Sequence, residues 1–342
     1  MSEFDLIRRY FTHAAPGALL GVGDDAALLQ VSAGNVLAVS TDMLVSGTHF
    51  LPDADPFLLG HKTLAVNLSD MAAMGAATRW AVLAIALPEA DEAWLAQFSA
   101  GFFALAQQHD VELVGGDTTR GPLNLCVTIF GEVPAQQALR RCGAQVGDEI
   151  WVSGCLGDAA LALAHLQGRI ALSGAELAAC LLALHRPQPR VALGLALRGI
   201  ASSAIDISDG LLADLGHILE ASQLGAEIRF DALPVSDVLR SYSVGARHAC
   251  ESRPEGAPTV QSSNLASLKW ALIQHCALSG GDDYELCFTV PAVRHAEVER
   301  LSARLDLPLT RIGEIVERRG CIVHDAAGNP INVEVRGYDH FR

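Results

Sequence analysis

Positively charged side chains are scarce in this sequence. Its 342 residues carry 24 lysines and arginines against 39 acidic side chains, for a net charge of −15, and Lys62 and Lys269 are its only lysines. An acidic chain repels nucleic acid and anionic membrane surfaces, so we expect neither as a partner. If the ligand is a phosphate ester, the charge that offsets its phosphates must come from arginine or from metal ions.

Several motifs that would place the chain in a known class are also missing. None of its eight cysteines forms a C-x-x-C pair, which argues against a zinc site and a disulfide framework. No apolar run approaches the ~20 residues that cross a bilayer. The charged N-terminus does not fit a signal peptide, so we expect a cytoplasmic protein. The P-loop and protein-kinase motifs are absent as well.

The composition and length predict a compact protein of two domains. Half of the residues are hydrophobic, only 18% are charged and 6% are aromatic, so the core is built from aliphatic side chains. A chain of this length favours two cores over one. The periodic pattern breaks down around residues 134–147, which predicts domains at 1–140 and 141–342. Residues 240–264 lack periodicity and are expected to form a mobile insertion.

Short apolar runs alternate with helical patterns in both halves, which predicts an α/β (α+β) fold. Residues 36–39 are predicted to be a buried strand, and residues 123–129 a strand with one wetted face. Further predicted strands cover 80–87, 111–114, 150–152, 204–205, 226–230, 286–290 and 311–315. Helices are predicted over 58–74, around 94–105, after 158, and over 176–185, 191–199 and 210–219.

Aspartates recur in short loops with Gly, Ser or Thr at the ends of these elements. Six such loops occur: Gly23-Asp24-Asp25, Ser40-Thr41-Asp42, Asn67-Leu68-Ser69-Asp70, Gly116-Asp117-Thr118, Asp206-Ile207-Ser208-Asp209 and Gly281-Asp282-Asp283. Mg2+ prefers hard oxygen ligands and commonly bridges one or two carboxylates to substrate phosphates. The loops therefore indicate magnesium-dependent phosphate chemistry.

Two other interpretations of the loops remain open. Asp, Ser and Gly are also the ordinary residues of turns and helix N-caps, so any single loop can be structural. The chain could also bind divalent ions without catalysis, but no EF-hand pattern, the usual motif of such proteins, occurs in it. Six loops, four of them within the first ~120 residues, favour a shared chemical role over turn preference alone.

Taken in order, the loops and their neighbours closely resemble the thiamine-monophosphate kinase family, of the superfamily that includes aminoimidazole ribonucleotide synthetase and selenophosphate synthetase. The matching stretches span nearly the whole chain: residues 21–27, 40–42 with His49-Phe50, 65–75, 115–121, 204–211, 279–286 and 337–341. The resemblance implies a two-domain fold in which each domain is a mixed sheet packed with helices. It also implies a homodimer whose N-terminal sheets pair across the two-fold axis.

The resemblance further implies an activity and a set of site residues. The activity is the phosphorylation of thiamine monophosphate by ATP, which gives thiamine diphosphate and ADP and uses several Mg2+ ions. The implied magnesium ligands are Asp25, Ser40, Thr41, Asp42, Asp70, Asp117, Asp206 and Asp209. The implied nucleotide contacts are Gly116, Asp117, Arg141 and Ser208, with Arg141 a candidate to stabilise charge, and the implied thiamine contacts are His49, Asp282 and Tyr338.

The sequence departs from the family pattern at Asp282, where the family usually has glutamate. A carboxylate remains on a shorter arm, which is expected to weaken a contact to the cationic thiamine or to make it water-mediated. Phosphoryl transfer requires chiefly alignment and charge neutralisation, and the acceptor phosphate is already largely ionised near neutral pH. We therefore assign no general base. A related enzyme that activates an amide oxygen for ring closure is the main alternative.

Overall fold

The computed structural model describes residues 3–242 and 261–333 of the chain. It divides into two compact units, one formed by Met1–Leu139 with His185–Gly199 and the other by Arg140–Leu184 with Ile200–Arg342. The sequence placed one boundary at residues 140 and 141 and did not foresee that the segment His185–Gly199 belongs to the first unit. Among the described residues, no helix combines the length and hydropathy needed to cross a bilayer.

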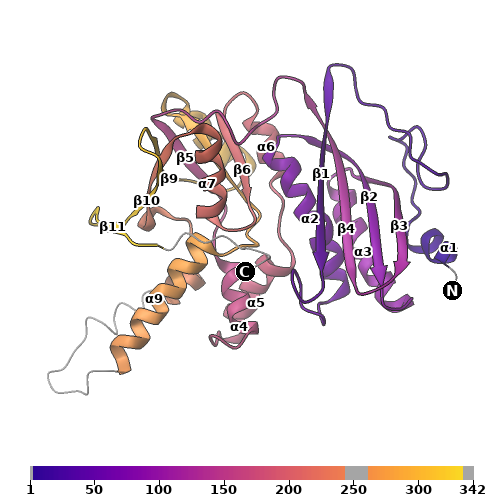
Figure 1. The fold of residues 1–342 in the computed structure, drawn as a ribbon, viewed down its shortest axis with the longest axis horizontal. Helices are drawn as coiled ribbons and strands as arrows, with labels where there is room; N and C mark the ends of the chain where they lie inside the picture. Colours follow the sequence, from indigo (N-terminus) through magenta and orange to yellow (C-terminus); the bar gives the residue numbers. More distant parts are fainter. Residues whose placement is uncertain (1–2, 243–260, 334–342) are drawn as a thin grey trace. The chain divides into compact units, whose positions relative to one another are not determined.

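The first unit contains a four-stranded sheet in the order β1-β4-β2-β3 (Figure 1). Its strands are β1 (Asn35–Val45), β2 (Ala77–Leu87), β3 (Glu112–Arg120) and β4 (Asn124–Pro134). Strands β2 and β3 run parallel, whereas β4 pairs antiparallel with both β1 and β2. A short helix α1 (Glu3–Leu6) and a π-helical turn η1 (Ile7–Phe11) precede the sheet.

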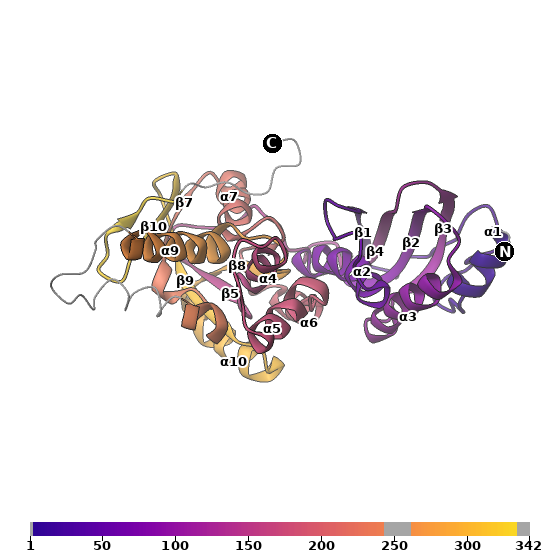
Figure 2. The ribbon, with the colours of Figure 1, turned by 90° about the horizontal axis from the view of Figure 1, so that it is seen from below.

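Helices α2 (Pro56–Ala73) and α3 (Glu92–Gln108) pack side by side and cover one face of this sheet (Figures 1 and 2). They approach closely because each has a glycine at the crossing: a Cβ on Gly60 would lie 2.0 Å from the Phe98 carbonyl oxygen. Helix α6 (Val191–Leu197) packs on α2, which explains why its segment belongs to the first unit.

The prediction that residues 36–39 form a strand is confirmed, but the prediction that this strand is buried is wrong. These residues open β1, which is an edge strand of the sheet. The side chains of Leu37, Val39 and Met43 are 42%, 53% and 53% exposed. Alternate residues of a strand face opposite sides, and these three lie on one side of β1. An apolar run of four residues does not reveal whether a second layer covers it.

The second unit contains a seven-stranded sheet in the order β11-β10-β7-β9-β5-β8-β6. Its strands are β5 (Asp148–Ser153), β6 (Ser203–Ile207), β7 (Gly225–Arg229), β8 (Glu285–Pro291), β9 (Leu309–Val316), β10 (Gly320–His324) and β11 (Pro330–Ile331). Strand β9 lies in the middle, and β5 pairs antiparallel with both β8 and β9. The predicted strands of this half are confirmed, whereas β10 and β11 were not predicted.

Within the described residues, the helices of the second unit are α4 (Asp158–Leu166), α5 (Gly174–His185), α7 (Leu211–Ser222), α9 (Gln261–Ser279) and α10 (His295–Leu305), and residues 237–242 are helical as well. Of two short 3-10 turns, η2 (Phe230–Ala232) follows β7 and η3 (Ala292–Arg294) connects β8 to α10. The predicted insertion at 240–264 is helical at both of its described ends: residues 240–242 end a helical stretch that starts at 237, and residues 261–264 begin α9. Residues 243–260 lie outside the described residues.

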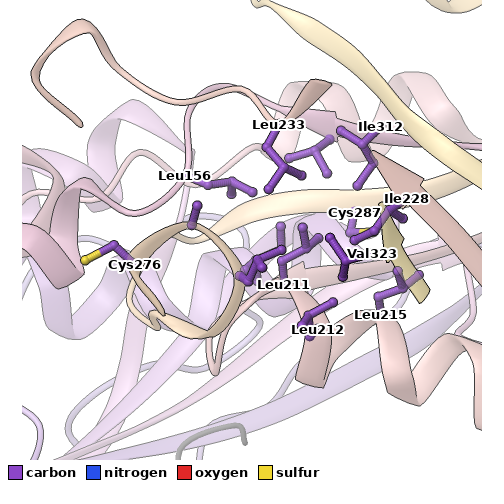
Figure 3. Close-up of a cluster of buried hydrophobic side chains, with 14 of the residues drawn as sticks. Leu156, Leu211, Leu212, Leu215, Ile228, Leu233, Cys276, Cys287, Ile312 and Val323 are labelled. Atoms are coloured by element: carbon purple, nitrogen blue, oxygen red, sulfur yellow. The ribbon is translucent and has the colours of Figure 1, made fainter. Parts of the chain in front are cut away.

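The core of the second unit forms where α7 meets the sheet (Figure 3). Leu211 and Leu215 of α7 lie among Ile228, Cys287 and Ile312, which come from three different strands. All five side chains are at most 1% exposed. This packing fixes the N-terminal end of α7, and the loop that leads into it carries the residues of the candidate site.

Candidate active site

In the first unit, the end of α2 and the middle of β1 bring several oxygen donors together. Ser40 and Asp42 lie two residues apart on one side of β1, and Asn67 and Asp70 lie one turn apart on α2. The Ser40 hydroxyl donates a hydrogen bond to Asp70 Oδ2. The Asp42 N–H donates to Asn67 Oδ1 at 3.3 Å, and Asn67 Nδ2 donates to the Thr63 carbonyl at 3.1 Å. Asn67 is buried, so its amide is fixed in orientation.

Thr41 lies between these residues but faces the other side of the sheet. Its Oγ1 is 2.8 Å from Thr128 Oγ1 on β4, the cross-strand partner of Thr41. Because strand residues alternate in direction, the Thr41 side chain points away from the side that carries Ser40 and Asp42.

Gly116 and Asp117 lie on β3, at the opposite edge of the sheet from β1. Three steps between neighbouring strands separate the two edges, a distance of about 14 Å. Gly116 is required by its surroundings, since its φ is +154° and a Cβ would lie 1.9 Å from the Leu83 carbonyl oxygen on β2. Within the chain the structure thus links Asp42 and Asp70 through Asn67 and Ser40 and leaves Asp117 apart.

Two further predicted residues of the first unit lie in loops. Asp25 is exposed in the loop between the paired residues Leu20 and Leu28. His49 lies in the turn after β1, where its Nδ1 accepts a hydrogen bond from the Val45 N–H at 3.0 Å. A neutral His49 therefore carries its proton on Nε2.

In the second unit, the end of β6 and the loop that leads from it to α7 carry three predicted residues. Asp206 is buried near the end of β6, and Ser208 and Asp209 follow it. The N–H groups of Ser208, Asp209 and Gly210 donate to a single atom, Oδ2 of Asp214 on α7, at 3.0, 3.0 and 3.1 Å. Burial raises the pKa of the Asp214 carboxyl to about 7, Asp206 adds to this rise, and the donated N–H groups oppose it.

A second loop, from Gly280 to Tyr284, packs against the first. The Asp282 N–H donates to the Ser208 carbonyl at 2.9 Å, and the Tyr284 N–H donates to the Ile207 carbonyl at 2.8 Å. Asp282 and Tyr284 have φ values of +68° and +50°, a conformation unfavourable for residues other than glycine. The Tyr284 hydroxyl donates to Asp282 Oδ1 at 3.1 Å. Strained residues of this kind often occur at functional sites.

The remaining predicted residues belong to the second unit by sequence. Arg141 is exposed, and the neighbouring Arg140 carbonyl accepts the Ala204 N–H at 2.9 Å, so this segment runs beside β6. Tyr338 lies outside the described residues. Asp283 was named in the predicted loop Gly281-Asp282-Asp283, but no role was predicted for it. Both of its carboxyl oxygens accept the N–H of Gly157 before α4, at 2.9 and 3.1 Å, and burial raises its pKa.

In the part of the chain that the structure describes, no three His, Cys, Asp or Glu side chains form a group ready to hold a metal ion. The donors that do meet at β1 and α2 are hydroxyl, carboxylate and amide oxygens, which is the ligand type that Mg2+ prefers. From the sequence, Asn67 was named within a motif but given no role, and Asp214 was not named. Spacing in the sequence could have revealed both residues. Asn67 precedes Asp70 by three helical positions, and Asp214 follows Gly210 at the start of a helix.

Comparisons with known proteins identify the class. The model of the AIR synthase related protein, N-terminal domain, matches residues 23–133, and the model of the corresponding C-terminal domain matches residues 145–326. Together these segments cover most of both units. The two-domain α/β architecture predicted from the sequence is that of this class.

Full-length relatives narrow the class. The chain is 48% identical to thiamine-monophosphate kinase of Escherichia coli (strain K12), over 99% of this chain and 98% of the relative. The crystal structure of thiamine-monophosphate kinase from Stenotrophomonas maltophilia K279a is 50% identical, with a TM-score of 0.77 over 90% of this chain and 91% of that chain. AaThiL complexed with AMPPCP and TMP is 29% identical, with a TM-score of 0.73 over 99% and 96% of the two chains. The chain belongs to the thiamine-monophosphate kinase family of AIR synthase related proteins.

Proposed function

We propose that this chain transfers the γ-phosphoryl group of ATP to thiamine monophosphate, giving thiamine diphosphate and ADP in thiamine diphosphate biosynthesis. The observation that carries the proposal is the 48% identity to a thiamine-monophosphate kinase over 99% of the chain. The similarity to AaThiL complexed with AMPPCP and TMP supports both substrates, because AMPPCP is an analogue of ATP.

The reaction brings two anions together, and the acidic chain has few cations to offset them. We propose that Mg2+ ions supply this charge, held by Asp42, Asp70 and Ser40 in the first unit and by Asp206 and Asp209 in the second. Asp25, Asp117 and Thr41 stay predicted ligands, although the Thr41 side chain faces the other side of the sheet. Asn67 and the Ser40 hydroxyl hold the first set in place through the hydrogen bonds described above.

The substrate contacts are proposed from the motifs identified in the sequence. Gly116, Asp117, Arg141 and Ser208 are assigned to the nucleotide. His49 donates its Nε2 proton toward a phosphate oxygen, because its Nδ1 already accepts the Val45 N–H. Asp282 faces the cationic thiamine with its carboxylate held by Tyr284, and Tyr338 keeps its predicted thiamine contact. The acceptor phosphate oxygen attacks in line without a general base.

We further propose that the chain forms a homodimer through the uncovered side of the first sheet. Leu37, Val39 and Met43 form an exposed apolar row there, while α2 and α3 cover the other side. An apolar row of this kind on a sheet favours burial against another surface. Pairing about a two-fold axis can also place the β3 edge of one protomer, with its Asp117, opposite the β1 edge of its partner. The cytoplasmic location stays a prediction from the sequence.

A coupled ADP assay tests the proposed activity. With thiamine monophosphate, ATP and Mg2+ present, the chain should release ADP at a rate that depends on thiamine monophosphate, and EDTA should stop it. Asp70→Asn should lower the rate strongly, because it removes a proposed metal ligand. A cyclising synthase of the same superfamily would show no dependence on thiamine monophosphate, and that result would overturn the proposal.

A further inference from the structure

The loop that leads into α7 is held by one side-chain oxygen. Three consecutive N–H groups, of Ser208, Asp209 and Gly210, converge on Oδ2 of Asp214 at 3.0 to 3.1 Å. The Asp214 side chain is 3% exposed, so water does not compete for these donors. Consecutive N–H groups turned toward one atom restrict the backbone of all three residues.

The same loop is also fixed on its carbonyl side. The Ser208 carbonyl accepts the Asp282 N–H at 2.9 Å, and a Cβ on Gly281 would lie 2.5 Å from that carbonyl oxygen. Gly210 has a φ of +112°, and its own Cβ would lie 2.6 Å from the Ser279 carbonyl carbon. Asp214 thus acts on a loop that is packed tightly against the segment carrying the thiamine-binding candidate Asp282.

Amide groups before a helix commonly bind phosphate or another anion. Here Asp214 already occupies that position from within the protein. The N–H groups of Ser208 to Gly210 are therefore not donors for a substrate phosphate. The loop can contribute to a phosphate-binding site through the Asp209 carboxylate, which lies beside Asp206 at the end of β6.

We propose that Asp214 is a positioning residue that accepts these three N–H groups and thereby holds Asp209 in place for cation binding, next to Asp206 at the end of β6. This rests on the proposed function, in which those two aspartates are metal ligands. Asp214 itself does not contact the metal or the substrates. Its contribution depends on an acceptor oxygen at the Oδ2 position and not on a full negative charge.

Binding of Mn2+ to the full chain, followed by electron paramagnetic resonance, tests this role directly. Asp214→Ala should weaken Mn2+ binding by about 10- to 100-fold, the usual effect of removing a residue that orients metal ligands. The Mg2+ concentration for half-maximal rate should rise in parallel. Asp214→Asn keeps the acceptor oxygen and should stay within about threefold of the wild type. If Asp214→Ala does not fold, Asp214→Ser takes its place, because its short side chain cannot reach all three donors.

Asp91→Ala is the matched control. Asp91 caps α3 by accepting the N–H groups of Ala93 and Trp94 at 2.8 and 3.2 Å, and it lies in the other unit. This variant should lower the unfolding midpoint without weakening Mn2+ binding. Wild-type Mn2+ affinity in Asp214→Ala, or an equal loss in Asp214→Asn, would overturn the role of Asp214. A wild-type chain that binds Mn2+ but does not phosphorylate thiamine monophosphate would instead refute the proposed activity alone.

Discussion

Replacement of Ser40 by alanine removes a hydrogen-bond donor from a proposed metal ligand. In the structure the Ser40 hydroxyl donates to Asp70 Oδ2, across the contact between β1 and α2. Ser40→Ala leaves the strand intact, because alanine fills the same backbone position without a new clash. The change therefore acts on the orientation and donor count of the site, and not on the fold.

The size of the effect follows from this one hydrogen bond. A hydrogen bond to a charged group is worth about 1.5–3 kcal/mol, which corresponds to about 10- to 150-fold in an equilibrium constant. Both side chains are only partly buried, so the lower end applies. Because Ser40 is itself a proposed metal ligand, this figure is a minimum, and we expect Ser40→Ala to raise the Mg2+ concentration for half-maximal ADP release by about tenfold or more. Initial rates over a Mg2+ titration, at saturating ATP and thiamine monophosphate, measure it.

Thr128→Val provides a control on the same sheet. It also removes one hydroxyl, but that hydroxyl pairs with Thr41 on the opposite side from Ser40. The Mg2+ dependence of this variant should match that of the wild type. An unchanged Mg2+ dependence in Ser40→Ala, or an equal shift in both variants, would refute the assignment of the Ser40–Asp70 pair to the metal site.

Three other changes test the dimer, the pH dependence and the loop packing. Val39→Asp places a charge in the exposed apolar row and should convert a dimer into a monomer in sedimentation velocity. Val293→Asp, at a site that is 92% exposed, is the control and should leave the dimer intact. A dimeric Val39→Asp would contradict the proposed interface. The hydrogen bond to Glu149 raises the pKa of His295 above 6.5, so its stabilisation is present below pH 6.5 and is lost as the pH rises through the higher folded value. His295→Gln should therefore lower Tm most at acidic pH, and a loss of Tm that is constant with pH would argue against this ion pair. Gly281→Ala would place a Cβ 2.5 Å from a backbone oxygen and should lower the free energy of unfolding in urea by about 1–3 kcal/mol; wild-type stability would show that the loop relaxes.

Much of the fold follows from local patterns in the sequence. The alternation of Leu125, Val127 and Ile129 predicted a strand with one buried side, and these three side chains are fully buried on β4. The burial of β1 could not be predicted in the same way, because an apolar run reports hydrophobicity and not the number of layers above it. The segment His185–Gly199 belongs to the first unit because α6 packs on α2, and local patterns do not predict contacts between residues so far apart in the sequence.

The candidate site could be predicted only in part. The sequence motifs identified the aspartates. In the structure, Ser40 donates a hydrogen bond to Asp70, and the loop after β6 is hydrogen-bonded to the loop that carries Asp282. Because side chains alternate along a strand, Thr41 faces the opposite side of the sheet from Ser40 and Asp42. The strand order places Asp117 at the far edge of the sheet. Neither feature is visible from loop composition, because both depend on which strands pair and in which register.

The fate of the γ-phosphoryl group tests the account most directly. The chain would be incubated with ATP labelled at the γ-phosphate, thiamine monophosphate and Mg2+, and the quenched products separated from the protein. We expect the label in thiamine diphosphate, none on the protein, and no transfer once EDTA has removed the cation. Label on the chain itself, or transfer that persists without divalent cations, would contradict a direct, cation-assisted reaction.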